Sequence, residues 1–140
     1  MRVAEIMTRD VHFLSPDTSV QQAARLMAEL DTGALPVGEA ADLRGILTDR
    51  DVLIRVVAQG RDPATTPVDA VMSSDLLTCT ADESVEAVVR RMESRQVRRV
   101  PVLEGGRVVG MLGARAILSA AGAATGAPVG EEPGGRGPLR

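Results

Sequence analysis

The sequence repeats itself at a constant distance of 65 residues, and this repeat limits the possible folds more than any other feature. Pro36 and Pro101 mark the step, and no gap is needed to extend it in either direction. Since neither copy is long enough to bury a full hydrophobic face alone, the two copies are expected to pack on each other. Such packing would create two clefts at the seam, related by a pseudo-two-fold axis. Other identical pairs at this distance are Met7 and Met72, Ser19 and Ser84, Met27 and Met92, and Gly45 and Gly110.

The composition argues against several classes of partner. The chain of 140 residues carries a formal net charge of −3, with one Phe and neither Tyr nor Trp. A general nucleic-acid binder or a protein of anionic membrane surfaces needs a basic field, and base stacking needs aromatic side chains. The sequence therefore predicts no nucleic acid and no membrane as partners. The lone cysteine, Cys79, cannot form an internal disulfide, and no signal segment opens the chain, so a cytoplasmic protein is expected.

Each copy shows the same order of predicted elements, namely strand, helix, strand, strand, helix. In the first copy, Ser19 is placed to cap a helix whose apolar face consists of Val20, Ala23, Ala24 and Met27. The second copy repeats this arrangement 65 residues later. Strands are expected at 11–14, 34–37 and 44–47 in the first copy and at 99–103 and 108–112 in the second, with a tight hairpin at Gly105 and Gly106.

The chain is expected to divide into a first repeat at 1–62, a second repeat at 63–120 and a disordered tail of Gly, Ala and Pro at 121–140. The closing helix of the first repeat, predicted at 51–59, is apolar on more than one side. A helix of this kind usually contacts more than its own core. We therefore expect a homodimer.

The segment GILTDRD, from Gly45 to Asp51, carries a more specific pattern: glycine, an apolar residue, any residue, threonine or serine, two further residues, aspartate. Together with the MT-like start, the PDTSV run and the ALPV and RRVPV segments, it resembles the tandem CBS-domain family, the Bateman modules. This resemblance implies an α/β fold of two CBS repeats with pseudo-two-fold symmetry, similar to stand-alone bacterial proteins of the family. Such paired modules often sense adenosine-containing nucleotides.

The resemblance also implies which residues bind the ligand. The Thr48 hydroxyl and the Asp51 carboxylate would hold the ribose and the nearby phosphate, with Gly45 and Ile46 in the same motif. A carboxylate can accept hydrogen bonds from two vicinal hydroxyls, and free N–H groups at the start of a helix favour phosphate. The other copy would complete the cleft, with an apolar pair against adenine and two basic residues near the phosphates; these are Leu76 and Leu77, and Arg98 and Arg99.

The second cleft departs from this pattern. Gly113 and Ala116 stand where the first copy has its threonine and aspartate, and Gly33 and Ala34 stand where the second copy has its arginines. One cleft would therefore have a ribose acceptor, a phosphate donor and positive charge, and the other none of them. We expect one ligand per chain.

Structural explanations of the same residues remain open. Thr48 and Asp51 also fit a helix capping box, and Arg98 and Arg99 could continue a solvated polar face. His12 is expected to be an exposed strand residue, and Cys79 a small buried one. With one His and one Cys, neither a metal site nor a catalytic nucleophile can be assembled, so no enzyme activity is expected.

The sequence thus predicts a non-catalytic regulatory module without a cofactor, which binds AMP, ADP, ATP or S-adenosylmethionine between its repeats and acts on a protein effector that the sequence does not identify. The alternative is a ligand-free dimeric interaction or stress-response protein, in which Thr48 and Asp51 only cap a helix.

Overall fold

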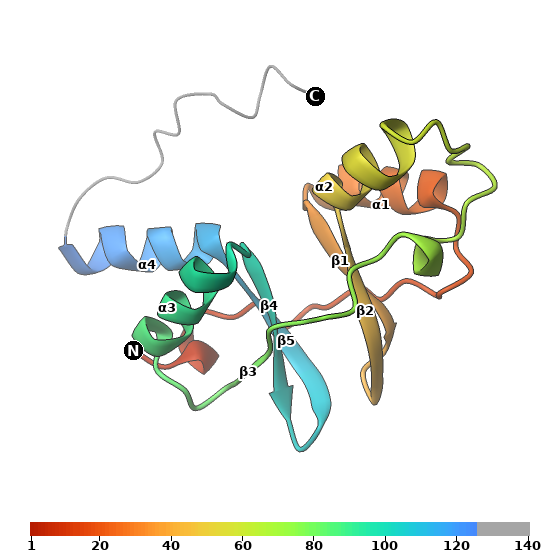
Figure 1. Cartoon of the computed structure of the whole chain (residues 1–140). Coiled ribbons are helices and arrows are strands. Elements are labelled where there is room, and N and C mark those ends of the chain that lie inside the picture. The colour runs from red at the N-terminus through yellow and green to blue at the C-terminus, as the bar shows by residue number, and fades with distance from the viewer. Residues whose placement is uncertain (126–140) are drawn as a thin grey trace.

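The computed structural model describes residues 1–125, which form two lobes (Figure 1). The first lobe contains α1 (Val20–Leu30), β1 (Ala34–Glu39), β2 (Asp42–Thr48) and α2 (Asp49–Val52), which continues as a π-helical turn, Leu53–Val57. The second lobe contains β3 (Cys79–Thr80), α3 (Val85–Arg95), β4 (Arg99–Glu104), β5 (Arg107–Gly113) and α4 (Ala114–Thr125). Short 3-10 helices, Val3–Glu5 and Val68–Ala70, precede the two copies. The hairpins lie side by side at the centre, with the helices to either side (Figure 1).

The two hairpins share one register, as the repeat predicts. Pro36 pairs with Ile46 in the antiparallel β1–β2 hairpin, and Pro101 pairs with Met111 in β4–β5, 65 residues later in both strands. Each hairpin also has a register shift at the same place, after Val37 in one and after Val102 in the other. The duplication therefore extends to irregular details of the backbone, and the expected α/β fold is confirmed.

The expected helix caps are present in both copies. The Ser19 hydroxyl accepts a hydrogen bond from the Gln22 N–H at 3.1 Å, and that of Ser84 accepts one from Ala87 at 3.2 Å. Both helices end in a left-handed residue, Asp31 with φ of 52° and its counterpart Gln96 with φ of 56°. The local signals of the sequence were sufficient for these boundaries.

Two details of the predicted elements are wrong. Ala24 is exposed, so the buried face of α1 consists of Val20, Ala23 and Met27 only. Residues 11–14 form no strand but a single bridge, in which the Leu14 N–H donates to the Pro36 carbonyl oxygen at 2.8 Å. Pro16 follows almost at once and has no N–H to donate, so the ladder cannot be extended.

The amino-terminal segment of each copy packs in the core of the other copy. Val3 and Met7 belong to the hydrophobic cluster of the second lobe, whereas Val68 and Val71 belong to that of the first. Main-chain hydrogen bonds fix both segments: the Val3 N–H donates to Glu83 at 3.0 Å, and the Val68 N–H donates to Thr18 at 2.8 Å. The units that pack are therefore not the continuous segments 1–62 and 63–120.

The boundary expected for the tail is also wrong. Helix α4 continues through Thr125, and Gly122 is buried. Alanine has the highest helix propensity of all residues, so the Ala-rich stretch at 120–124 extends the helix instead of ending it. The rest of the expected tail, 126–140, lies outside the described residues.

Candidate functional site

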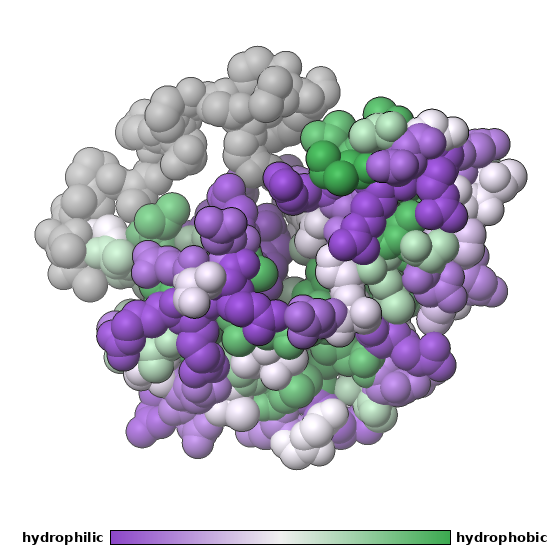
Figure 2. Space-filling model, in the orientation of Figure 1, coloured by the Kyte–Doolittle hydropathy of each residue, from purple (hydrophilic) through white to green (hydrophobic). Residues whose placement is uncertain are grey.

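A cleft of about 570 Å³ opens between the two copies at the start of α2. Figure 2 shows hydrophilic side chains on both lobes around the hollow between them. The cleft brings together residues from β2 and α2 of the first copy with the segment after Met72 and the end of α3 in the second. Seven of the eight candidate residues line it: Ile46, Thr48, Asp51, Leu76, Leu77, Arg98 and Arg99.

Gly45 does not line the cleft but allows two chain segments to meet beside it. A Cβ at this position would lie 2.8 Å from the Ser73 carbonyl oxygen. The neighbouring Ile46 exchanges main-chain hydrogen bonds with Ser73, each 2.9 Å long. Gly110 has the same relation to Thr8 in the other copy, at 2.9 Å. The glycine of the motif thus serves the backbone approach that joins the copies.

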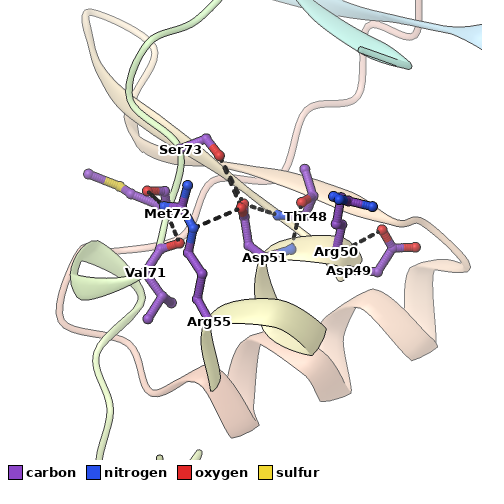
Figure 3. A network of polar contacts seen from close by, with 8 residues as sticks. All are labelled: Thr48, Asp49, Arg50, Asp51, Arg55, Val71, Met72 and Ser73. Carbon is purple, nitrogen blue, oxygen red and sulfur yellow. Dashed lines mark hydrogen bonds and ion pairs between the residues drawn. The ribbon is translucent and has the colours of Figure 1, made fainter. Parts of the chain in front are cut away.

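Thr48 and Asp51 form a complete capping box (Figure 3). The Asp51 N–H donates to the Thr48 hydroxyl oxygen at 3.0 Å, and the Thr48 N–H donates to Asp51 Oδ2 at the same distance. Asp51 is only 6% exposed. The structural explanation of this pair is therefore realised in the geometry, and any ligand must bind to a carboxylate that already stabilises the start of α2.

The Asp51 carboxylate also contacts the second copy. The Ser73 hydroxyl donates to Asp51 Oδ1 at 3.0 Å, and Arg55 Nε lies 3.8 Å from the same oxygen. Arg55 Nη1 in turn donates to the carbonyl oxygens of Val71 at 3.3 Å and Met72 at 3.1 Å (Figure 3). The sequence analysis missed both residues. A hydroxyl at Ser73 and at its counterpart Thr8 was the available signal for one of them.

The first three N–H groups of α2 are already occupied. Asp49 donates to the Gly33 carbonyl oxygen at 2.8 Å, Arg50 donates to Asp49 Oδ1 at 2.8 Å, and Asp51 donates to Thr48 as described. The expectation that these groups would be free for phosphate is wrong. Side chains must therefore supply the contacts to any anion in this cleft.

Arginine side chains are abundant in the cleft. Arg98, which is exposed, and Arg99, which is partly buried at the start of β4, lie on the side of the second copy. Arg95 lies 3.6 Å from the Asp75 carboxylate and donates to its carbonyl oxygen at 3.1 Å. The other two arginines, which the sequence analysis did not assign to the site, are Arg50 and Arg55. Five arginines face three aspartates, so the cleft carries surplus positive charge; the aspartates are Asp49, Asp51 and Asp75.

The opposite seam contains a second cleft of about 630 Å³, where Gly113 and Ala116 take the places of Thr48 and Asp51. It has no carboxylate at the position of Asp51. Its walls are not free of positive charge, however, because Arg99 and Arg115 both line it. Arg115 lies 4.0 Å from the Asp31 carboxylate. The expected lack of positive charge in this cleft is therefore wrong, since Arg99 reaches both seams.

The remaining candidates lie away from the first cleft. Burial raises the pKa of the Cys79 thiol to about 11, and Glu83 nearby adds to this effect, so Cys79 is a buried thiol with little thiolate. His12 is exposed as expected, 3.4 Å from the Asp10 carboxylate. Among residues 1–125, no three metal-ligating side chains come together. No helix in the same range is long and apolar enough to cross a bilayer.

Comparison with curated proteins identifies close relatives. The chain is 41% identical over 110 residues to the CBS domain-containing protein YhcV of Bacillus subtilis, which covers 79% of this chain and 78% of that protein. It is 37% identical over 109 residues to hypoxic response protein 1 of Mycobacterium tuberculosis, covering 77% and 76%. The relatives therefore match the chain over both copies.

Solved structures with the same fold include two with informative contents. The CBS domain pair of protein MJ0100, in complex with 5′-methylthioadenosine and S-adenosylmethionine, matches with a TM-score of 0.80 at 25% identity, over 89% of this chain and 98% of that one. A hexameric CBS-CP12 protein from bloom-forming cyanobacteria matches with a TM-score of 0.76 at 30% identity, over 84% and 69%. The family model described as CBS domain matches residues 3–58 and 68–123. The chain belongs to the CBS-domain family and carries two CBS domains in tandem.

Proposed function

We propose that this protein is a non-catalytic regulatory module that binds one adenosine nucleotide per chain in the cleft at Asp51. Pairs of CBS domains are in general regulatory and bind adenosine ligands. The observation that carries the proposal is the difference between the seams. One cleft places Thr48 and Asp51 opposite Leu76 and Leu77, and the other has Gly113 and Ala116 in the first two positions.

Ligand binding at Asp51 requires an exchange of hydrogen bonds. A carboxylate has about four acceptor positions, and Thr48, Ser73 and Arg55 already face three of them. Two ribose hydroxyls would therefore displace the Ser73 hydroxyl. Because Ser73 belongs to the segment that crosses from one copy to the other, this exchange would loosen a contact between the copies. We infer that the ligand signals by changing their relative position.

The apolar part of the ligand has a place in the same cleft. Ile46, Leu76 and Leu77 line it and are buried or half-buried, so an adenine ring between them would remove apolar surface from water. Arg98 and Arg99 lie where the phosphates would extend. The protein effector that reads the change stays unidentified, and we propose the cytoplasm as the compartment because the chain contains only a single buried thiol.

The second candidate function is a ligand-free dimeric interaction protein. The complete capping box favours it, because Thr48 and Asp51 then need no ligand to explain them. Both functions include a homodimer, which we infer from the exposed apolar side chains on the helix that begins at Asp49: Leu53, Ile54 and Val57.

Isothermal titration of the full chain with adenosine, AMP, ADP, ATP and S-adenosylmethionine tests the proposal. We expect binding of at least one of these compounds, at one site per chain. No heat and no thermal stabilisation with any of them would favour the ligand-free function. Two equivalent sites per chain would contradict the assignment to the Asp51 cleft, because the second cleft has no carboxylate at that position.

A further inference from the structure

Three of the five arginines in the cleft are not committed to the aspartates and carbonyl groups described above. Arg55 is held by Asp51 and the Val71 and Met72 carbonyl oxygens, and Arg95 is held by Asp75. The guanidinium groups of Arg50 and Arg98, in contrast, have no hydrogen-bond or ion-pair partner among residues 1–125, and both residues are exposed. With Arg99, they are the cationic groups of the cleft that an anion could contact without breaking one of these pairs.

These groups come from both walls of the cleft. Arg50 follows Thr48 and Asp49 on the first copy, whereas Arg98 and Arg99 precede the central strand of the second. Figure 3 shows Arg50 and Asp49 on the opposite side of Asp51 from Arg55. Arg50 therefore lies apart from the contact between Asp51 and Arg55, on the side of the cleft that remains open to an anion.

The charge balance gives the class of ligand. If the pairs of Arg55 with Asp51 and of Arg95 with Asp75 count as neutral, Arg50, Arg98 and Arg99 remain against Asp49 alone. Guanidinium groups bind phosphate oxygens in a bidentate manner, and an unbalanced pair of positive charges attracts a polyanion more than a monoanion or a cation. The main-chain N–H groups at the start of α2 are occupied, so this cluster must supply the recognition.

We propose that the ligand is a nucleoside di- or triphosphate, and that Arg50 selects it by contacting the phosphates beyond the first. This inference rests on the proposed function, which leaves the number of phosphates open. Adenosine and AMP would leave Arg50 without a partner. S-adenosylmethionine would place a sulfonium and an ammonium group beside surplus positive charge, so it would bind more weakly than any of the phosphates.

The chain contains a matched control for Arg50. Arg115 is its counterpart 65 residues later, at the second cleft, where its side chain lies 4.0 Å from the Asp31 carboxylate. In that cleft Gly33 and Ala34 stand in place of Arg98 and Arg99. Arg115→Gln thus removes an equivalent charge at an equivalent helix position, but away from the proposed phosphates.

The test is calorimetric titration of the wild type, Arg50→Gln and Arg115→Gln with adenosine, AMP, ADP, ATP and S-adenosylmethionine, in buffer with a chelator so that ATP is free of magnesium. The wild type should bind ATP and ADP about tenfold more tightly than AMP, the scale of one charged contact. Arg50→Gln should lower the ATP affinity about fivefold and leave the adenosine affinity unchanged, as expected for a partly exposed charge pair. Arg115→Gln should match the wild type.

Salt dependence gives an independent readout, since exposed charge pairs are screened. The ratio of ATP to adenosine affinity should fall as salt rises, and this fall should be smaller in Arg50→Gln. Equal affinities for ATP and AMP, tighter binding of S-adenosylmethionine than of AMP, or equal effects of the two substitutions would overturn the inference while the proposed function stands. A lack of binding by every adenosine compound would overturn both.

Discussion

The Asp51 carboxylate connects the start of α2, the crossing segment at Ser73 and the side chain of Arg55. A buried carboxylate with several donors stabilises the fold whether or not a ligand is present. Its substitution alone therefore cannot separate a structural role from a binding role. A second variant that alters only one of its contacts is needed.

Asp51→Ala should weaken nucleotide binding by about 1.5–3 kcal/mol, the scale of a lost hydrogen bond to a charged group. It should also lower the free energy of unfolding by about 1–2 kcal/mol, because the capping box is lost. Titration calorimetry and urea denaturation measure the two effects separately.

Ser73→Ala is the companion variant, because it keeps both hydrogen bonds between Thr48 and Asp51. The hydroxyl of Ser73 competes with the ribose for the carboxylate, so its removal should not reduce nucleotide affinity. If Ser73→Ala loses as much affinity as Asp51→Ala, the ribose does not take the place of this hydroxyl and the proposed exchange is wrong.

At the scale of elements, an ion pair ties the start of the second copy to α3. Arg91 donates to both carboxylate oxygens of Glu83, at 2.8 and 3.2 Å, and the Glu83 carbonyl oxygen accepts from Val3. The hydrogen bond from Arg91 holds the pKa of Glu83 below its usual range. A hydrogen bond from Thr80 similarly lowers the pKa of the neighbouring Asp82.

The sign of the resulting pH dependence follows from these directions. A carboxyl group whose pKa is lower in the folded state stabilises the protein above its unfolded pKa, which for glutamate is about 4.3, and the contribution is lost as the pH falls through the folded pKa. Arg91→Met should therefore cost about 0.5–1 kcal/mol at neutral pH and progressively less under acid conditions.

Urea denaturation at several pH values checks this expectation, with Arg90→Met as the control on the exposed side of α3. Arg90 has no ion pair among residues 1–125, so its substitution should change stability equally little at every pH. A penalty for Arg91→Met that does not shrink with acid would show that the packing of the side chain matters more than its charge.

The same scale shows why the sequence predicted some features and not others. Caps at Ser19 and Ser84 and the two hairpins depend on residues close in sequence, and the repeat allowed each to be checked against its counterpart. The contacts of Ser73 and Arg55 with Asp51, and of Val3 with the second lobe, join distant segments. No local pattern specifies which copy such a segment joins.

At the scale of the whole molecule, surplus apolar surface indicates an assembly. Leu53 is 58% exposed and Val57 is 64% exposed, next to each other on the same turn of helix. The helix also carries Asp51 and Arg55, so a second copy packed here would lie close to the nucleotide cleft. A closed two-fold dimer is the commonest way to cover such a face.

Leu53→Glu combined with Val57→Glu should convert the dimer into monomers, because two charges would be buried without partners. Light scattering of the purified protein measures the mass, and Gln21→Glu on the exposed side of α1 should leave it at twice the chain mass. A wild type that is already monomeric at micromolar concentration, or a double variant that stays dimeric, would place the interface elsewhere or remove it.

The exchange of Val3 and Val68 between the two cores means that neither domain is a continuous piece of the gene. A fragment that starts after the first seven residues would leave an opening in the second core, where Val3 and Met7 are now buried. Loss of order in one lobe would likewise expose the bed of a segment that belongs to the other. The two domains should therefore unfold in a single transition, and a signal that loosens one of them is transmitted to its twin through the main chain itself.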